Sequence, residues 1–508
     1  MTSRHAAILL LLVLVFVVQA VDAAGIKSYG GTLHLSAGGD LSSTDPAKVD
    51  SIAAWELGRQ VHETLFRMTP EGLIMPSLAH ELPAVSDDGK LWTIKLRPGL
   101  RFHDGSTIDS QAVLMSWQRL LDAKTASPHW WLLAPVRGAV AFHAGKLTKL
   151  SGVEIVNSLE FRIRLKHPMP AFVEALSALP TAPLSRRTLR AEGGVPVHPS
   201  GSGPFMFSEE TTDLPLRLVP FLRHARGRPF LDYLVLMRFV SPREALLAFE
   251  LGKLHLVPFP PKLIDSRLRM VDTAINRMVF LVMNKDHLNQ LPAGFFEVVN
   301  HVLDRRALVA YMVGERGRPM DELIRLDDTG QLQGKRVEVL EAKAYVQRML
   351  IQRVGIAPVF EFIISATDPF ARGLAERIQL NLQDVGMSVQ IIELSHDELR
   401  TRIAKGQYDF RLERPLPLVQ DPLLQLLSFL GRLSDSAELE DALDALMLVP
   451  DSTSRVGVAR ERARRKMIDL SWVPLMVHSD RLYVRNAVHD LRPDRHGVID
   501  FADVWLEE

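Results

Sequence analysis

The apolar positions of the chain follow two patterns, and together these predict a mixed α/β protein. Short runs and alternations, which are typical of strands, appear in GTLHLSA (31–37), LWTIKLRPGLRFHDG (91–105) and GVEIVNSLEFRIRLKHP (152–168). The last of these predicts a hairpin that bends at its Asn-Ser dipeptide. Asp109 precedes apolar residues at helical spacing, so it predicts a helix that begins at residue 110.

The segment 360–412 carries the clearest local signals. Its first strand is followed by Asp368, a good N-cap, and by a helix that Gly386 ends. After the strand SVQII, Ser395 and Glu398 predict a capping box for a second helix, and YDFRL predicts a third strand. This β-α-β-α-β order predicts a parallel sheet with right-handed crossovers.

Parallel strands place their carboxyl ends at one edge of the sheet, where ligands bind in open α/β folds. Thr367 follows the first strand, and the stretch 413–418 follows the third. We therefore expect Thr367, Arg411, Glu413 and Arg414 to contribute to a binding site. Two alternatives stay open: Arg411 and Glu413 lie on one face of the strand and pair with each other, or the loop is solvated and has no role.

The first residues predict the compartment. A short basic start precedes an apolar run over 6–20, and small residues around Ala23 and Ala24 offer a cleavage point. This pattern predicts a cleavable secretory signal peptide over residues 1–24, because the run is shorter than the ~20 residues of a membrane-spanning helix. We expect the mature chain to be soluble and exported.

The amino-acid composition excludes several classes of function. The chain has no cysteine, which excludes disulfides, thiol nucleophiles, thiolate metal sites and a lipid anchor on cysteine. Its 60 basic and 60 acidic residues balance, so nothing indicates a nucleic-acid partner. The G-x-S-x-G, H-E-x-x-H and phosphate-loop motifs of enzymes are absent from the sequence. We expect a protein that is not an enzyme.

Two further groups of residues have a functional and a structural interpretation. Trp130 and Trp131 could offer an aromatic face to a ligand, or pack in a core. The histidines are scattered without metal-selective spacing, although His62, His80, His103 and His129 could converge in space.

Several stretches, in order along the chain, resemble the extracytoplasmic solute-binding proteins of ABC importers, family 5 (the peptide/nickel class). The resemblance covers essentially the whole chain after the predicted signal peptide. It rests on these stretches: STDPAKVDS, VHETLFRMTPEGLIMPSLAHELPAVSDDGKLWTIKLRPGLRFHDGS, GVEIVNSLEFRIRLKHPMPAFVEALS, GSGPFMF, GRPFLDYL, AFELGKLHLVPFP, VLDRRALVAYMVGE and VPLMVHSDRLYV.

The resemblance implies a two-lobed periplasmic-binding-protein-like clam-shell (type II) with an extra subdomain on the first lobe. A monomer without cofactor would enclose a peptide or small molecule in the periplasm and deliver it to ABC permease and ATPase subunits. The implied organisation is a signal peptide (1–24), lobe I (25–50, 151–258 and 478–508), the extra subdomain of lobe I (51–150) and lobe II (259–477).

The resemblance also implies that the usual amine contact is missing. Peptide-binding members carry a tryptophan and then an aspartate between YD and DP, and that aspartate pairs with the peptide's α-amine. Here Pro415 and Leu418 occupy these two positions. The loop before Asp368 also lacks an arginine that some dipeptide binders use. Three ligand classes remain open: a peptide or similar organic solute, a nickel or other metal chelate or haem, and no small molecule at all, in a degenerate receptor or scaffold.

Overall fold

The structure is a computed structural model. It describes residues 27–36, 44–191, 195–196, 198–208, 215–239, 241–258, 269–288, 291, 294–321, 339–352, 359–366, 368–433, 436–449 and 452–507. The predicted signal peptide and Thr367 lie outside these residues. Among the helices formed by the described residues, none is both long enough and apolar enough to cross a membrane.

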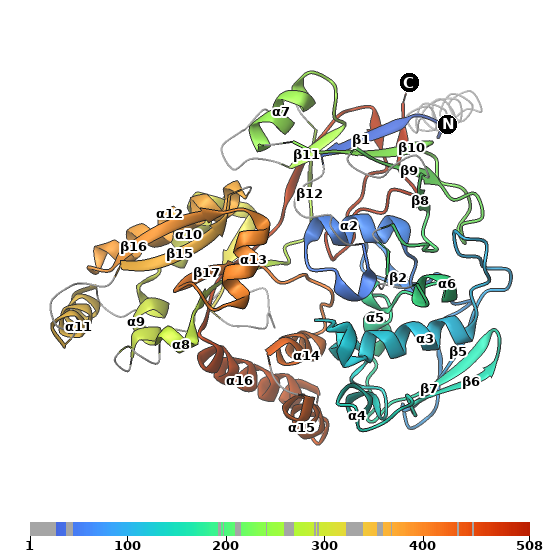
Figure 1. Cartoon of the computed structure of the whole chain (residues 1–508), viewed down its shortest axis with the longest axis horizontal. Coiled ribbons are helices and arrows are strands. Elements are labelled where there is room, and N and C mark those ends of the chain that lie inside the picture. Colours follow the sequence, from blue (N-terminus) through green and yellow to red (C-terminus); the bar gives the residue numbers. More distant parts are fainter. Residues whose placement is uncertain are drawn as a thin grey trace, which may run out of the picture.

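A first, seven-stranded sheet lies near the two ends of the described chain (Figure 1). At its centre β1 pairs in parallel with both β10 and β11, and β9 and β19 pair antiparallel with β10 and β11 on either side. Its spatial order is β12 (Arg269–Asp272), β19 (Arg481–Val484), β11 (Leu256–Pro258), β1 (Thr32–Ser36), β10 (Tyr233–Met237), β9 (Leu216–Pro220) and β8 (Phe205–Phe207).

A second, six-stranded sheet contains the predicted β-α-β-α-β run. Its order is β14 (Gly317–Pro319), β18 (Trp472–His478), β13 (Arg277–Met283), β17 (Phe410–Glu413), β15 (Val359–Ser365) and β16 (Ser388–Leu394). Strand β15 pairs in parallel with both β16 and β17, which confirms the predicted parallel arrangement. The predicted caps are also confirmed: Asp368 accepts the amides of Phe370 and Ala371, and Ser395 with Glu398 forms the capping box.

The extra subdomain is built on a four-stranded antiparallel sheet. Its order is β4 (Ala84–Val85), β5 (Leu91–Lys95), β7 (Glu160–Arg164) and β6 (Val153–Asn157), with a separate hairpin of β2 (Phe66–Met68) and β3 (Ile74–Pro76). The predicted hairpin over 152–168 is confirmed. This sheet takes strands from both sides of the expected boundary at 150, and the first sheet takes β12 from beyond 258. The sheets therefore do not divide at residues 150 and 258. The lobe boundaries expected there stay predictions.

The helices cover the sheets and join the parts. Asp109 caps α3 through the amide of Ala112, as predicted. The described helices are α2 (Ile52–Val61), α3 (Ser110–Leu121), α4 (Ala139–His143), α5 (Phe172–Ala175), α6 (Arg186–Leu189), α7 (Pro242–Glu250), α8 (Lys285–Leu288), α9 (Phe295–Val302), α10 (Arg305–Met312), α11 (Val339–Gln352), α12 (Pro369–Asp384), α13 (His396–Ala404), α14 (Pro422–Leu433), α15 (Ser436–Met447) and α16 (Ser452–Leu470). The short 3₁₀ helices are η1 (Pro46–Lys48), η2 (Ala123–Thr125), η3 (Trp130–Leu133), η4 (Leu179–Thr181) and η5 (Gly314–Arg316).

Strand β13 shows how the core is divided. All seven of its residues are buried, and the six apolar ones, at 278–283, alternate between two apolar clusters. Phe280 and Val282 contribute to a cluster that includes the extra subdomain and α14 to α16, whereas Val279 and Leu281 contribute to the cluster under α10 and α12. Helices α14 to α16 therefore lie between the second sheet and the extra subdomain (Figure 1).

Candidate functional site

The carboxyl ends of four strands meet at one edge of the second sheet. Strands β15, β16 and β17 are parallel, and β17 and β18 both pair antiparallel with β13. Strand β18 therefore runs in the same direction as the other three. This edge is the general position for ligands in open α/β sheets.

The same edge adjoins a two-stranded connection between the two sheets. The chain crosses at 273–276, between β12 and β13, and returns at 479–480, between β18 and β19. The Thr273 amide donates to the Asp480 carbonyl oxygen at 2.8 Å, and the Asp480 amide donates to Thr273 Oγ1 at 2.9 Å. Paired crossing segments of this kind can act as a hinge that closes two lobes over a ligand.

Arg277 fastens this connection to the C-terminal segment of the chain. Its Nε lies 2.6 Å from Asp480 Oδ2, and its Nη atoms donate to the carbonyl oxygens of His496 and Gly497, each at 3.3 Å. Burial alone would raise the pKa of Asp480, but the Arg277 charge holds that pKa below its ordinary value. Across from them on α2, burial raises the pKa of Glu56 to about 7. Residues Glu56, Arg277 and Asp480 thus bring charge from both lobes to the hinge.

Two of the predicted site residues, Arg411 and Glu413, form an ion pair with each other on β17. Burial would lower the pKa of Arg411, but Glu413 and Tyr408 overcome that effect and raise it. The alternative in which these two side chains pair is therefore the one seen in the structure. Whether they also contact a ligand remains a prediction.

Arg414 lies at the sheet edge, as expected for a residue that directly follows β17. Its guanidinium pairs with Asp368 at the start of α12 and lies 5.5 Å from the ring centre of Phe370. His478 also stacks on Phe370, with a ring-centre separation of 4.8 Å. Neither Phe370 nor His478 was among the residues expected at the site, and His478 stands at the end of an otherwise apolar strand.

The loop after β17 is buried. All residues from Pro415 to Val419 are buried, and Leu418 is 2% exposed within the cluster shared with the extra subdomain. The Leu418 amide donates to the Leu416 carbonyl oxygen at 2.9 Å, a tight turn that the fixed φ of Pro417 favours. We call residues 415–419 the strap. Its burial excludes the solvated-loop alternative.

Glu174 of α5 fixes the end of the strap. Its carboxylate accepts from the backbone amides of Gln420, at 2.5 Å, and Asp421, at 3.2 Å. His496 Nε2 lies 3.6 Å from the same carboxylate. Asp421 in turn caps α14 by accepting the amides of Leu423 and Leu424 in its first turn. Nothing in the sequence near Glu174 indicates this contact, because its partners follow about 250 residues later.

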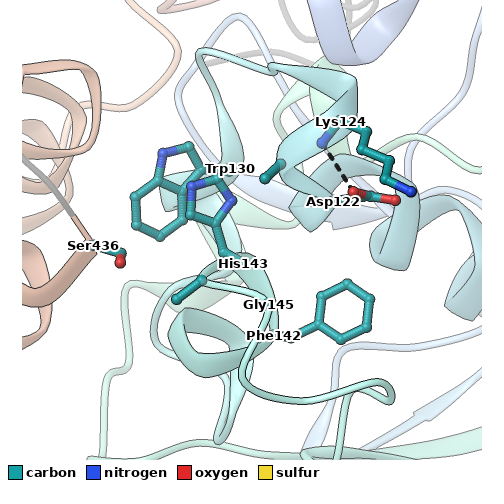
Figure 2. Close-up of a pocket in the computed structure, with 9 residues that line it drawn as sticks. Asp122, Lys124, Trp130, Phe142, His143, Gly145 and Ser436 are labelled. Atoms are coloured by element: carbon teal, nitrogen blue, oxygen red, sulfur yellow. Dashed lines mark hydrogen bonds between the residues drawn. The ribbon is translucent and has the colours of Figure 1, made fainter.

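Trp130 and Trp131 lie in η3, away from the sheet edge. Their exposed fractions are 5% and 0%, and Trp131 packs against Gly431 of α14. Trp130 stacks on His143 at 3.9 Å and also borders a cavity of about 490 Å³, which Figure 2 shows beside Asp122, Lys124 and Phe142. Trp131 is therefore a core residue, and Trp130 both packs in the core and lines this cavity.

The histidines considered for metal binding serve mainly as backbone contacts. The Nε2 atoms of His62 and His103 lie 3.1 and 3.0 Å from the carbonyl oxygens of Thr44 and Gly203, and Nε2 of His129 contacts that of Val49. Burial lowers the pKa of His62 to about 3 and that of His103 to about 4. No cluster of three or more potential metal-ligating side chains occurs within the part of the chain that the structure describes.

Comparison with known proteins agrees with this architecture. The model of the bacterial extracellular solute-binding proteins, family 5 (middle region), matches residues 74–435. The chain is 31% identical to the periplasmic murein peptide-binding protein MppA of Escherichia coli K12 over 184 residues, which cover 35% of this chain and 34% of MppA. It is 24% identical to di/tripeptide-binding protein 2 of Pseudomonas aeruginosa over 492 residues, which cover 89% and 90% of the two chains.

Solved structures share the fold over nearly the whole chain. Listeria monocytogenes OppA bound to peptide superposes with a TM-score of 0.81 at 18% identity and covers 94% of this chain and 99% of its own. The Escherichia coli murein tripeptide-binding protein MppA gives 0.81 at 17% identity and covers 95% and 99%. The predicted fold class, an α/β clam-shell of two lobes with an extra subdomain, is confirmed, and it defines a binding protein. The chain belongs to the extracellular solute-binding proteins of family 5.

Proposed function

We propose that the chain is the extracytoplasmic substrate-binding component of an ABC importer, which encloses a peptide or similar organic solute between its two lobes. One observation carries this proposal: the carboxyl ends of β15, β16, β17 and β18 meet at the two-stranded hinge. A ligand at that edge would contact both lobes at once. Closure about the hinge would then depend on the ligand.

The expected partners follow from the family. The loaded protein would act as a periplasmic monomer that delivers its ligand to a membrane permease with ATPase subunits, and it would catalyse no reaction. The relatives named above are periplasmic peptide binders by name, which supports this location and ligand class. At the sheet edge, Arg414 could offer charge to such a ligand, Phe370 an aromatic face, and His478 its Nε2 atom, which has no hydrogen-bond partner among the described residues.

A second candidate is favoured by the strap. Residues 415–419 fill the space after β17 with the chain's own apolar side chains, and Glu174 fixes the end of the strap from the other lobe. A receptor or scaffold that binds no small molecule would have a cleft filled in this way. Metal-chelate or haem binding has no comparable support among the described residues.

Native mass spectrometry of the purified protein distinguishes these candidates. A bound peptide or organic solute of defined mass, released on denaturation, would support import. Titration calorimetry with peptide pools would then measure its affinity. A protein that carries no ligand and binds no peptide pool with a Kd below about 1 mM, a binding free energy near −4 kcal/mol, would support the scaffold instead. A mass increment that chelators remove would support a metal complex.

A further inference from the structure

A second cavity, of about 310 Å³, lies outside the sheet edge. Its walls come from the end of α2 with Arg59, strand β2 with Arg67 and the turn that follows it, and the C-terminal segment 490–503 with Arg492. Four basic and five acidic side chains line it, counted from its lining residues. Its chemistry therefore depends on which of these charges already have partners.

Four of its carboxylates are committed to partners. Asp490 contacts Lys27 at 2.9 Å and accepts from the indole of Trp505. Asp494 accepts the backbone amides of His496 and Val498 at 2.8 and 3.0 Å. Asp500 pairs with Arg226 at 2.5 Å. Asp503 lies 3.5 Å from the same guanidinium. The partners of these acids are thus Lys27, Arg226 and backbone amides, so Arg59, Arg67 and Arg492 have no carboxylate within 3.5 Å among the described residues.

The guanidinium groups of Arg59, Arg67 and Arg492 have only weaker partners among the described residues. Arg67 Nε is buried and donates to no acceptor there, and Arg67 forms no salt bridge with a described residue. Arg59 donates to the Thr64 hydroxyl at 3.4 Å, and Arg492 reaches Asp490 only at 3.8 Å. Buried donors without partners are costly, so natural proteins usually supply a partner from solvent or from a ligand.

We propose that this cavity binds the oxyanion of a small molecule, a phosphate or a carboxylate, through Arg67 with Arg59 and Arg492. A planar guanidinium donates two parallel hydrogen bonds to either group, and such charge-assisted bonds are stronger than neutral ones. The cavity has room for a small metabolite rather than for a bare ion alone. The site is separate from the sheet edge, so it does not depend on the proposed transport function.

Glu71, at the rim of the cavity, is the carboxylate that would compete with a bound anion for the arginines. Hydrogen bonds from its own backbone amide and from the Thr69 hydroxyl, with the charges of Arg492 and Arg67, hold the pKa of Glu71 below its ordinary value. Its negative charge opposes an incoming anion. The substitution Glu71→Gln is therefore expected to tighten anion binding, whereas a role of these arginines in stabilising the fold alone would leave anion affinity unmoved.

Calorimetry at low ionic strength tests the site, with inorganic phosphate and succinate as separate probes. We expect saturable one-to-one binding of at least one probe, and that probe identifies the source of the oxyanion. Arg67→Met, which keeps the aliphatic stem, is expected to weaken binding tenfold or more. Arg223→Met, at an exposed arginine outside the cavity, is the matched control and is expected to leave it unchanged.

Thermal unfolding of each variant shows whether it is folded, and Arg492→Met at the exposed rim provides a second test if Arg67→Met unfolds. The proposal is overturned if neither probe binds with a Kd below about 10 mM. It is also overturned if both folded arginine variants of the cavity bind as tightly as the wild type.

Discussion

Trp130 Nε1 donates a 3.0 Å hydrogen bond to the carbonyl oxygen of Gly431. This bond joins η3 of the extra subdomain to α14 of the second lobe, across 301 residues of sequence. The neighbouring Trp131 packs on the same glycine, where an added Cβ would lie 2.4 Å from the Trp131 Cβ. The close approach of the two segments therefore requires glycine at position 431.

Replacing Trp130 with phenylalanine should destabilise the protein by about 1 kcal/mol more than the same change at Trp131. Both rings are buried, so both substitutions lose similar packing. Only Trp130→Phe also leaves a buried carbonyl oxygen without its donor, because Trp131 Nε1 has no hydrogen-bond partner among the described residues. Urea unfolding of the two variants measures the difference. Equal losses at the two positions would show that the bond to Gly431 contributes nothing.

Glu56 should make stability fall as pH rises towards 7 and above. Burial raises the pKa of this carboxyl from 4.5 to about 7 in the folded protein, so the folded state holds its proton more tightly than the unfolded chain. Its stabilising contribution is complete below about pH 4.5 and is lost as pH rises through about 7. Glu56→Gln should remove this loss and stabilise the protein at pH 8 by about 1–3 kcal/mol.

The check is the free energy of unfolding of wild type and Glu56→Gln between pH 5 and pH 8. The buried histidines act in the opposite sense: burial lowers the pKa of His103 to about 4, so its contribution is lost as the pH falls below 6.5. The difference between the two proteins cancels that term. Asp87→Asn, in an exposed turn, is the control and should reproduce the wild-type profile. A difference that does not change with pH would contradict the assignment to Glu56.

The predictions that succeeded rest on signals confined to short stretches. The caps at Asp368 and Ser395, and the alternation of strand and helix over 360–412, each depend on neighbours within a few residues. Strands that alternate with helices in this way are connected by right-handed crossovers, so a parallel sheet is expected. The carboxyl edge that carries Arg414 follows from the same reasoning.

The contacts that reasoning from sequence missed join distant segments. Glu174 meets Gln420 across 246 residues, and Arg277 meets Asp480 across 203. No local pattern marks a glutamate whose partners are backbone amides of another lobe. The strap shows the same limit, because its apolar residues have the composition of either a buried turn or the floor of a pocket. The strap is a buried turn because α14 and the extra subdomain pack around it.

Leu418→Asp should destabilise the protein by several kcal/mol, because it places a carboxylate in an apolar cluster where Leu418 is 2% exposed. If the cleft has the geometry of the family's peptide binders, a peptide with a free amine would pair with the new carboxylate and restore part of that stability. Thermal unfolding with and without peptide measures this rescue. Leu418→Asn is the control, since it is polar but has no charge to pair. Rescue of both variants alike would mean that the amine does not reach position 418.

Blocking a peptide's amino terminus by acetylation should leave its binding unchanged or improve it, if peptides are the ligands. A buried amine needs a carboxylate partner, and leaving one partner of a buried pair without the other costs about 3–5 kcal/mol. Leu418 offers no such partner, the Glu413 carboxylate is held by Arg411, and that of Asp421 caps α14. Calorimetry with matched free and acetylated peptide pools provides the measurement. A tenfold or greater loss of affinity on acetylation, about 1.4 kcal/mol, would mean that another carboxylate binds the amine. Glu413 would then be the first to examine, since it would only have to exchange Arg411 for the ligand.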